Sequence, residues 1–183
     1  MRNLLILLLL AIGICGANYI VNGDFEQPTT VGWTFTTLGS GCWVLRNTGY
    51  DPDPDYEVCV NKNGPSGFAK LHQTIDVIIT DLNFSVHTKL YAYDSKVGSW
   101  AAASVVLSYM NDFNTVLGET RICQKSAHCP WASSPTRHLI IAADTSWRDY
   151  SFNINDELTN LPGVDPLEIS KIQVALFDTT RIC

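Results

Sequence analysis

The sequence predicts an all-β protein, an antiparallel β-sandwich, on three observations. Short segments throughout the chain alternate apolar with polar side chains, the pattern of a strand with one buried face. Gly, Pro, Asn or Asp residues bound most of these segments. Between the segments there is no helical pattern longer than one turn. About ten short strands without intervening helices are typical of two packed antiparallel sheets.

The predicted elements follow one another from a short apolar opening at residues 19–21. The predicted strands span residues 33–36, 42–45, 56–60, 68–75, 85–93, 102–109, 116–122, 138–143, 147–154 and 169–177. The strand at 102–109 is apolar and β-branched enough to lie at the centre of a sheet. One helical turn is predicted at 156–158, where Asn155 is the candidate N-cap and Pro162 with Gly163 ends it.

The first 17 residues have the pattern of a secretory signal peptide. Arg2 supplies a positive charge, an apolar run follows, and small residues up to Ala17 precede the expected cleavage site. The alternative is a retained anchor, although the run is short for a bilayer span. We therefore expect a secreted, extracellular protein with one domain at 18–183, a length that can bury a full core.

Composition excludes two classes of partner. Without Arg2 the chain has eleven basic and eighteen acidic residues, a formal net charge of −7. An acidic protein of this kind is repelled by nucleic acid and by anionic membrane surfaces, so neither is an expected partner.

Five cysteines remain after cleavage, and in an oxidising compartment they predict disulfides. Proximity in sequence pairs Cys42 with Cys59 and Cys123 with Cys129. Cys183 is then left over: it stays free, forms a covalent link to a partner chain, or displaces one of these pairings. A zinc site is the competing interpretation, but the spacing does not match paired Cys-x-x-Cys knuckles.

Several motifs, taken in order, resemble carbohydrate-binding modules with the galactose-binding-like jelly roll. Plant cell-wall proteins with galactose-binding-like domains share the opening motif. The matching segments are residues 20–26 (IVNGDFE), 32–33 (GW), 67–75 (GFAKLHQTI), 107–109 (LSY), 116–120 (VLGET), 147–152 (WRDYSF) and 172–178 (IQVALFD). The chain departs from the family pattern at its last five residues and in the segment that holds Cys123 and Cys129.

The resemblance implies a jelly roll that binds carbohydrate without catalysis, and it implies one structural calcium ion. By position, Asp24, Glu26 and Asp178 would supply carboxylates to that ion, since calcium prefers oxygen ligands. The alternative is that Asp24 and Asp178 are turn residues. A second acidic run at residues 51–57 contains two prolines and lacks the EF-hand spacing, so a solvated loop is expected there.

Aromatic side chains are the candidate sugar-binding groups, because a flat ring stacks on the apolar face of a pyranose. Family members commonly hold the ligand on strands of a concave face, which favours Tyr91 and Tyr93. Binding at loop tips would instead favour Trp43, Tyr50 and Trp131. For each ring, packing is the alternative role. Trp33 and Trp147 lie in motifs typical of the core, so both are interpreted as structural.

The remaining motifs favour a binding protein over an enzyme. The sequence contains no His-Glu-x-x-His motif and no Gly-x-Ser-x-Gly motif. The sequon that begins at Asn83 is a candidate glycosylation site. The expected function is noncatalytic recognition of cell-wall, matrix or glycoprotein glycans. The rival functions are a structural or adhesive protein that binds protein partners, and a glycoside hydrolase.

Overall fold

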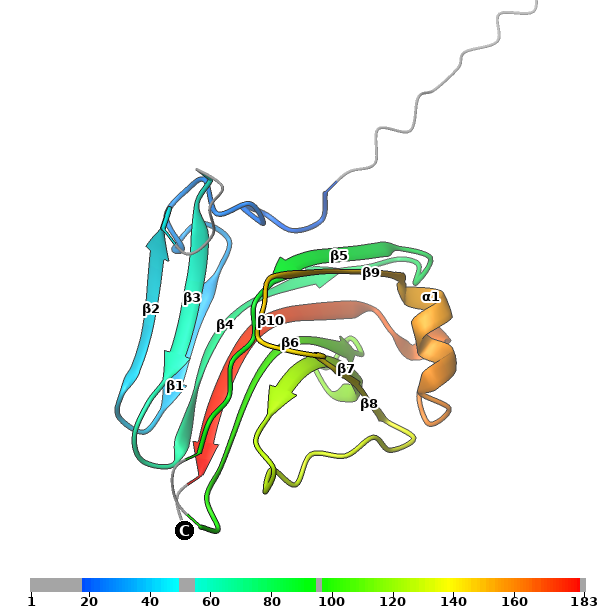
Figure 1. Cartoon of the computed structure of the whole chain (residues 1–183). Coiled ribbons are helices and arrows are strands. Elements are labelled where there is room, and N and C mark those ends of the chain that lie inside the picture. Colours follow the sequence, from blue (N-terminus) through cyan, green and yellow to red (C-terminus); the bar gives the residue numbers. More distant parts are fainter. Residues whose placement is uncertain (1–17, 50–54, 95–96, 182–183) are drawn as a thin grey trace, which may run out of the picture.

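A computed structural model describes residues 18–49, 55–94 and 97–181, and its fold is the predicted β-sandwich (Figure 1). One layer is a six-stranded sheet in the order β1-β4-β10-β6-β7-β8. Its strands are β1 (Thr34–Leu38), β4 (Gly67–Asp76), β10 (Lys171–Arg181), β6 (Trp100–Met110), β7 (Val116–Lys125) and β8 (Arg137–Ile141). The predicted signal peptide, Tyr50 and Cys183 lie outside the described residues. Within the described ranges, no helix is both long and apolar enough to span a bilayer.

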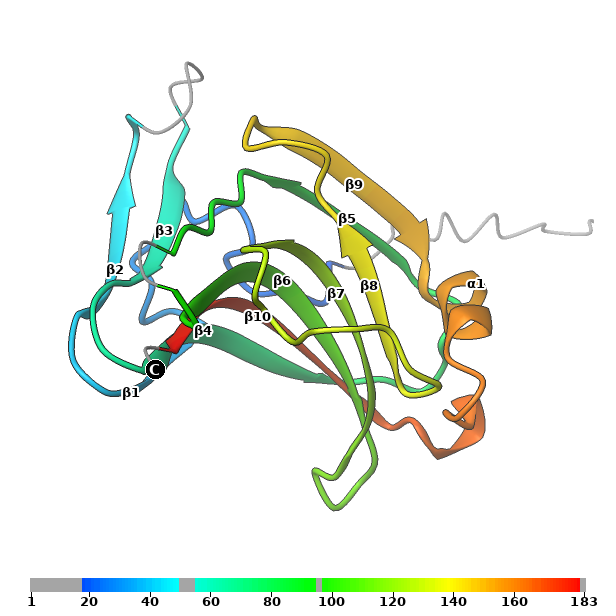
Figure 2. The same cartoon turned by 60° about the horizontal axis from the view of Figure 1, so that its bottom comes forward.

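The second layer consists of two separate strand pairs. Here β2 (Cys42–Asn47) pairs with β3 (Glu57–Lys62), and β5 (Asn83–Thr88) pairs with β9 (Arg148–Asn153). In the described part of the chain these two pairs share no ladder hydrogen bonds. The layer is therefore divided between β3 and β5 (Figures 1 and 2).

Strand β10 is the centre of the large sheet. It runs antiparallel to β4 on one side and to β6 on the other, in register from Lys171 to Thr180 on both sides. Strand β8 joins β7 in parallel, while every other strand pair in the described ranges is antiparallel.

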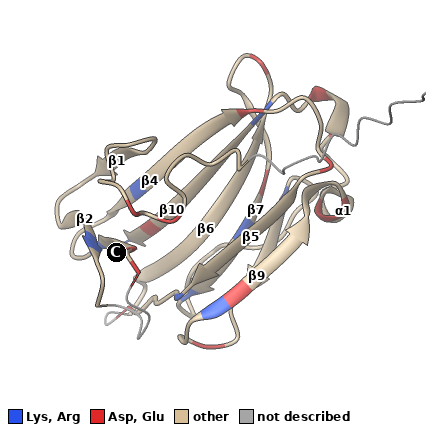
Figure 3. Cartoon of the chain, turned by 90° about the horizontal axis from the view of Figure 1, so that it is seen from above, with Lys and Arg blue, Asp and Glu red and all other residues tan. Residues whose placement is uncertain are grey.

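Alternation along these strands divides the large sheet into an inner and an outer face. The inner residues form most of the core with side chains from the second layer; the most buried are Leu71, Val105, Leu107, Tyr109, Ile122 and Ile172. Phe84 of β5 and Phe152 of β9 close the core from above, with ring centroids 5.3 Å apart. Figure 3 shows β6 without a charged residue, in keeping with its prediction as a central strand.

The six-stranded sheet is curved. Figures 1 and 2 show it as an arch, with β5 and β9 over the convex side. The outer face, with residues such as Lys70, Arg121 and Phe177, is therefore the concave one.

Three local predictions need correction. Strand β5 ends at Thr88 rather than residue 93, because its partner β9 begins at Arg148, opposite Thr88. Residues 19–21 form a bend and turn rather than a strand. The N-cap of α1 (Ile154–Glu157) is Asn153 instead of Asn155: its side chain accepts hydrogen bonds from the backbone N–H groups of Asn155 and Asp156.

A buried polar network attaches this short helix to the sheet. Glu157 is 6% exposed and accepts hydrogen bonds from the Thr120 hydroxyl at 2.9 Å and the Asn160 amide at 3.1 Å. Its carboxylate also lies 2.5 Å from Nδ1 of His138 on β8. Tyr109 extends the network through a 3.0 Å hydrogen bond to Thr120. Buried polar groups of this kind stabilise a fold only while each one keeps its partners.

Replacing Glu157 with alanine is expected to lower the free energy of unfolding by about 3 kcal/mol, because several buried groups lose their acceptor. The control is Glu168→Ala, which removes an exposed carboxylate from η2 (Pro166–Glu168). It is expected to change the free energy of unfolding by less than ~0.5 kcal/mol. Urea unfolding of both variants measures the difference. Equal stabilities would contradict the role given to Glu157.

Candidate functional site

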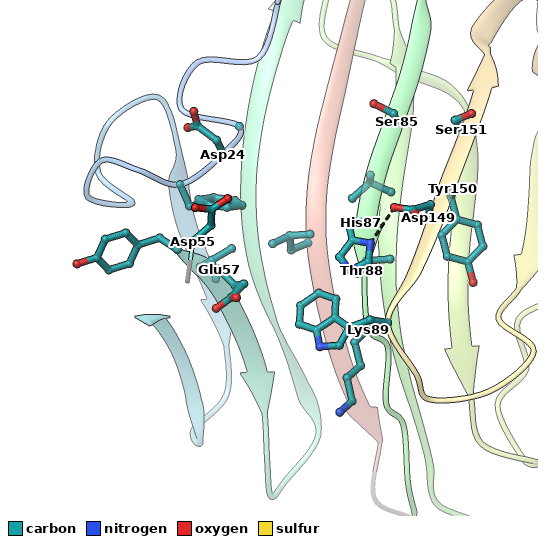
Figure 4. Close-up of a pocket in the computed structure, with 17 residues that line it drawn as sticks. Asp24, Asp55, Glu57, Ser85, His87, Thr88, Lys89, Asp149, Tyr150 and Ser151 are labelled. Atoms are coloured by element: carbon teal, nitrogen blue, oxygen red, sulfur yellow. Dashed lines mark hydrogen bonds and ion pairs between the residues drawn. The ribbon is translucent and has the colours of Figure 1, made fainter. Parts of the chain in front are cut away.

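A groove lies in the second layer, between the β2–β3 pair and the β5–β9 pair. It consists of two adjoining cavities of about 650 and 340 Å³. Both are lined by Leu176 of β10 at the inner face of the large sheet, and by Lys89 and Trp147 from the β5–β9 side. Because the two cavities share these residues, they form one continuous groove, and Figure 4 shows its larger part.

The wall on the β3 side is acidic. Asp24, from the opening loop, and Asp55 and Glu57, at the start of β3, lie together on this side in Figure 4. Arg46 of β2 fixes this wall from behind. Its guanidinium lies 3.1 Å from the centre of the Tyr56 ring and donates hydrogen bonds to the carbonyls of Phe25 and Glu26.

Glu57 has an unusual environment. It lines the groove, yet each of its carboxylate oxygens exposes less than 1 Å² and has no hydrogen-bond partner among the described residues. A buried carboxylate without a donor is costly, so most buried polar atoms in proteins are paired. The missing partner is therefore a candidate role for a ligand.

The opposite wall combines ring, hydroxyl and charged groups. His87 of β5 stacks on Trp147 with an interplanar angle of 2° and a centroid distance of 5.1 Å. Nδ1 of the same histidine lies 2.8 Å from the Asp149 carboxylate, across the β5–β9 ladder. Ser85 and Ser151 add hydroxyl groups, and they face each other in the same ladder (Figure 4).

The narrower end of the groove lies beside Asp178. Its carboxylate accepts a 2.7 Å hydrogen bond from the backbone N–H of Lys62, which connects β10 to β3. Burial raises the pKa of Asp178 to about 6, and the hydrogen bonds to its carboxylate only partly offset this effect. Cys59 lies at the same end, where burial raises the pKa of its thiol and the nearby Asp178 raises it further.

The raised pKa of Asp178 predicts a pH dependence. Because the folded state holds this proton more tightly than the unfolded chain, the free energy of unfolding falls as pH rises from about 3.8 to about 6. We expect this carboxyl to contribute about 1–3 kcal/mol of the fall. Asp178→Asn removes that contribution, so the difference between wild type and variant should change across this window and be constant above it. Denaturant unfolding at a series of pH values measures it; a constant difference throughout would contradict the assignment.

The predicted tyrosines separate into two environments. Tyr91 is 64% exposed and lines the narrower end of the groove. Tyr93 is 67% exposed but lies in a different pocket, with Trp100 and Arg181. The prediction placed both tyrosines within a strand, whereas in the structure both follow the end of β5. Of the two tyrosines, therefore, only Tyr91 lines the groove.

The two described tryptophans predicted to bind from loop tips lie away from the groove. Trp43 is on β2 and is 42% exposed. The Trp131 ring lies 6.1 Å from that of Phe177, and the Arg121 guanidinium lies 4.2 Å above it. Trp131 therefore lies on the concave side of the large sheet, and its role in binding stays a prediction.

The three predicted calcium ligands do not form one site. Asp24 and Asp178 line different cavities of the groove, and Glu26 accepts a hydrogen bond from the Tyr56 backbone. Within the described residues, no group of three His, Cys, Asp or Glu side chains is placed to hold a metal ion. Bound calcium stays a prediction.

The predicted pairing of Cys42 with Cys59 is wrong. In the β2–β3 ladder Cys42 opposes Lys62 and Cys59 opposes Leu45, so the two cysteines are three positions out of register and point to opposite faces. That offset is about 10 Å along the strands, beyond the Cα separation a disulfide allows. Both are free thiols in the structure, as are Cys123 and Cys129.

Cys123 and Cys129 are close enough to affect each other. Burial, reinforced by Cys129, raises the pKa of the Cys123 thiol to about 11. In an oxidising compartment we still expect these two to pair, because a short turn brings Cys129 back toward β7. Peptide mapping by mass spectrometry without reduction should link these two positions and leave Cys42 unlinked to Cys59. Alkylation of both Cys123 and Cys129 before reduction would contradict the pairing.

The sequon asparagine is accessible. Asn83 is exposed at the first position of β5, and its side-chain oxygen accepts a 3.3 Å hydrogen bond from the Asn153 amide. Its glycosylation stays a prediction.

The groove residues that sequence reasoning missed are Trp147, Glu57, His87 and Lys89. Trp147 was interpreted as core, whereas it is half-buried and lines both cavities. Residues 51–57 were interpreted as a solvated loop; Asp55 fits that description, but Glu57 begins β3 and is partly buried. The acidic composition of this segment was the signal that could have indicated the site.

No family model and no curated protein matches this chain. Among the solved structures that resemble it, two have a TM-score of 0.50. One is the enzymatically active domain of tailspike protein 4 from bacteriophage CBA120, at 14% identity, covering 90% of this chain and 19% of that one. The other is described as carbohydrate-binding modules of the β-sandwich superfamily with promiscuous specificity, at 12% identity, covering 91% of this chain and 56% of that one.

The present chain thus spans about a fifth of the tailspike chain and just over half of the module's chain. At these identities the likeness concerns the fold alone. Together with the strand topology, it defines the fold: a β-sandwich like that of a structure described as carbohydrate-binding modules.

Proposed function

We propose that this protein is secreted and binds carbohydrate in the groove without cleaving it. The observation that carries the proposal is the combination of aromatic rings with carboxylate and hydroxyl groups in one open groove. Sugar sites need both: a ring stacks on the apolar face of a pyranose, while carboxylates and hydroxyls orient its hydroxyl groups.

Aromatic rings line the β5–β9 side of the groove. Tyr91 offers an exposed ring at one end, and Tyr150 and Trp147 lie along the β5–β9 wall. The carboxylates of Asp24, Asp55 and Glu57 face them from the β3 side (Figure 4). A chain of sugars lying along the groove would therefore meet both aromatic rings and hydrogen-bond acceptors.

The comparisons support the proposal at the level of fold only. One similar structure is described as carbohydrate-binding modules of the β-sandwich superfamily, and another is an enzymatically active domain, both at low identity. Absence of catalysis is therefore a separate part of the proposal. Incubation with polysaccharides should release no new reducing ends; release that depends on the protein would contradict a purely binding role.

Tyr91 and Tyr93 provide a matched pair of variants. They are the same residue type, two positions apart and almost equally exposed, but only Tyr91 lines the groove. Tyr91→Ala should weaken glycan binding about tenfold, the effect of losing one stacking contact. Tyr93→Ala should leave it unchanged. The measurement is calorimetric titration with a glycan chosen from an array.

The opposite pattern, a loss on Tyr93→Ala alone, would place binding outside the groove. An array without any bound glycan would contradict the proposed function itself and favour the rival, a protein that binds protein partners.

A further inference from the structure

We propose that the groove selects glycans with free amino groups, such as chains of unacetylated glucosamine. The inference rests on the proposed function and specifies its ligand class. Three features support it: the negative charge of the groove, the carboxylate of Glu57 without a partner among the described residues, and the aromatic rings that can stack on a sugar.

The groove is strongly acidic. Its lining includes five carboxylates, from Asp24, Asp55, Glu57, Asp149 and Asp178, against one lysine, Lys89, and one histidine, His87. His87 lies against Asp149, and the Lys62 backbone donates a hydrogen bond to Asp178. On the β3 side, Asp24 accepts a 3.4 Å hydrogen bond from the Glu26 backbone, whereas Glu57 has no partner among the described residues. Asp24, Asp55 and Glu57 together make this wall negative.

This charge disfavours some ligands and favours others. A uronate or sulfated chain would bring like charges together in a partly desolvated site, which costs free energy. A neutral chain can donate its hydroxyl groups to the carboxylates but brings no opposite charge. A protonated amine does both, because it donates hydrogen bonds to a carboxylate and also neutralises part of the negative charge of the groove.

Glu57 is the residue that points to a cationic donor. Its oxygens are withdrawn from water and have no partner among the described residues, so the structure bears the cost of a buried carboxylate without the compensating donor. An ammonium group at the β3 wall would supply that donor after a rotation of the side chain. The carboxylates are distributed along the walls, and no three of them converge in the described part of the chain, which suits an extended chain better than a single ion.

The rings distinguish a glycan from other cationic polymers. Tyr91 and Trp147 offer surfaces for pyranose rings, and the paired hydroxyls of Ser85 and Ser151 suit sugar hydroxyl groups. A lysine-rich peptide carries the same charges without flat apolar ring faces. We therefore expect it to bind more weakly than an amino-sugar chain of equal charge.

The test compares a glucosamine oligosaccharide with its N-acetylated counterpart of the same length, at a mildly acidic pH where the amines are protonated. The whole exported chain should bind the free-amine form about tenfold more tightly, and raising the salt concentration should reduce this preference. Glu57→Gln should weaken binding of the free-amine form about tenfold and change the acetylated form by less than about twofold. Glu168→Gln removes the same charge outside the groove and should change neither.

Folding does not confound this test. Glutamine keeps the shape of Glu57 and removes an unpaired buried charge, so Glu57→Gln should melt at the wild-type temperature or above it. A loss of binding with unchanged melting temperature supports a ligand contact. A lower melting temperature would show that Glu57 has a structural partner and would overturn its role.

The remaining outcomes separate the two proposals. Equal binding of acetylated and free-amine chains would overturn the inference and leave carbohydrate binding in place. Absence of binding to any glycan would overturn the proposed function. Equal binding of a lysine-rich peptide of matched charge would show that the groove recognises charge alone, and would overturn the assignment to amino sugars.

Discussion

The central position of β10 is the constraint on which the other features of the molecule depend. The strand is hydrogen-bonded to β4 and β6 along nearly its whole length, so its register fixes both neighbours. Because side chains alternate, Leu176 and Asp178 must face the second layer while Phe177 faces away. The floor of the groove, the connection to Lys62 and the packing surface beneath Trp131 all follow from this alternation.

The groove exists because the second layer is incomplete. A continuous sheet over β10 would bury Leu176 and leave no space between β3 and β5; two separate strand pairs leave it partly covered. The two walls differ in chemistry because they come from different parts of the chain. The β3 wall follows an acidic, proline-containing segment, whereas the β5–β9 wall carries a histidine–carboxylate pair on an aromatic ring.

Buried carboxylates are compensated differently in two parts of the fold. The network around Glu157 at the far end of the sheet is fully paired and anchors the helix to the sheet. Glu57 and Asp178 are carboxylates that the fold buries with few compensating contacts, or with none for Glu57 among the described residues. Groups held at a cost to folding are common at functional sites, and here both occur in the same groove.

Alternation and turn residues in the sequence were sufficient to predict the sandwich, most strands and the central place of β6, because these depend on local periodicity. The resemblance named Tyr91 as a sugar-binding ring and Asp178 as a calcium ligand; both residues line the groove, and both roles stay predictions. The sequence could not exclude a bond between Cys42 and Cys59, because only the pairing register of β2 with β3 turns the two to opposite faces. Nor could the sequence predict that Glu57 lies across the groove from His87 and Trp147, because contacts between distant segments are decided when the layers pack.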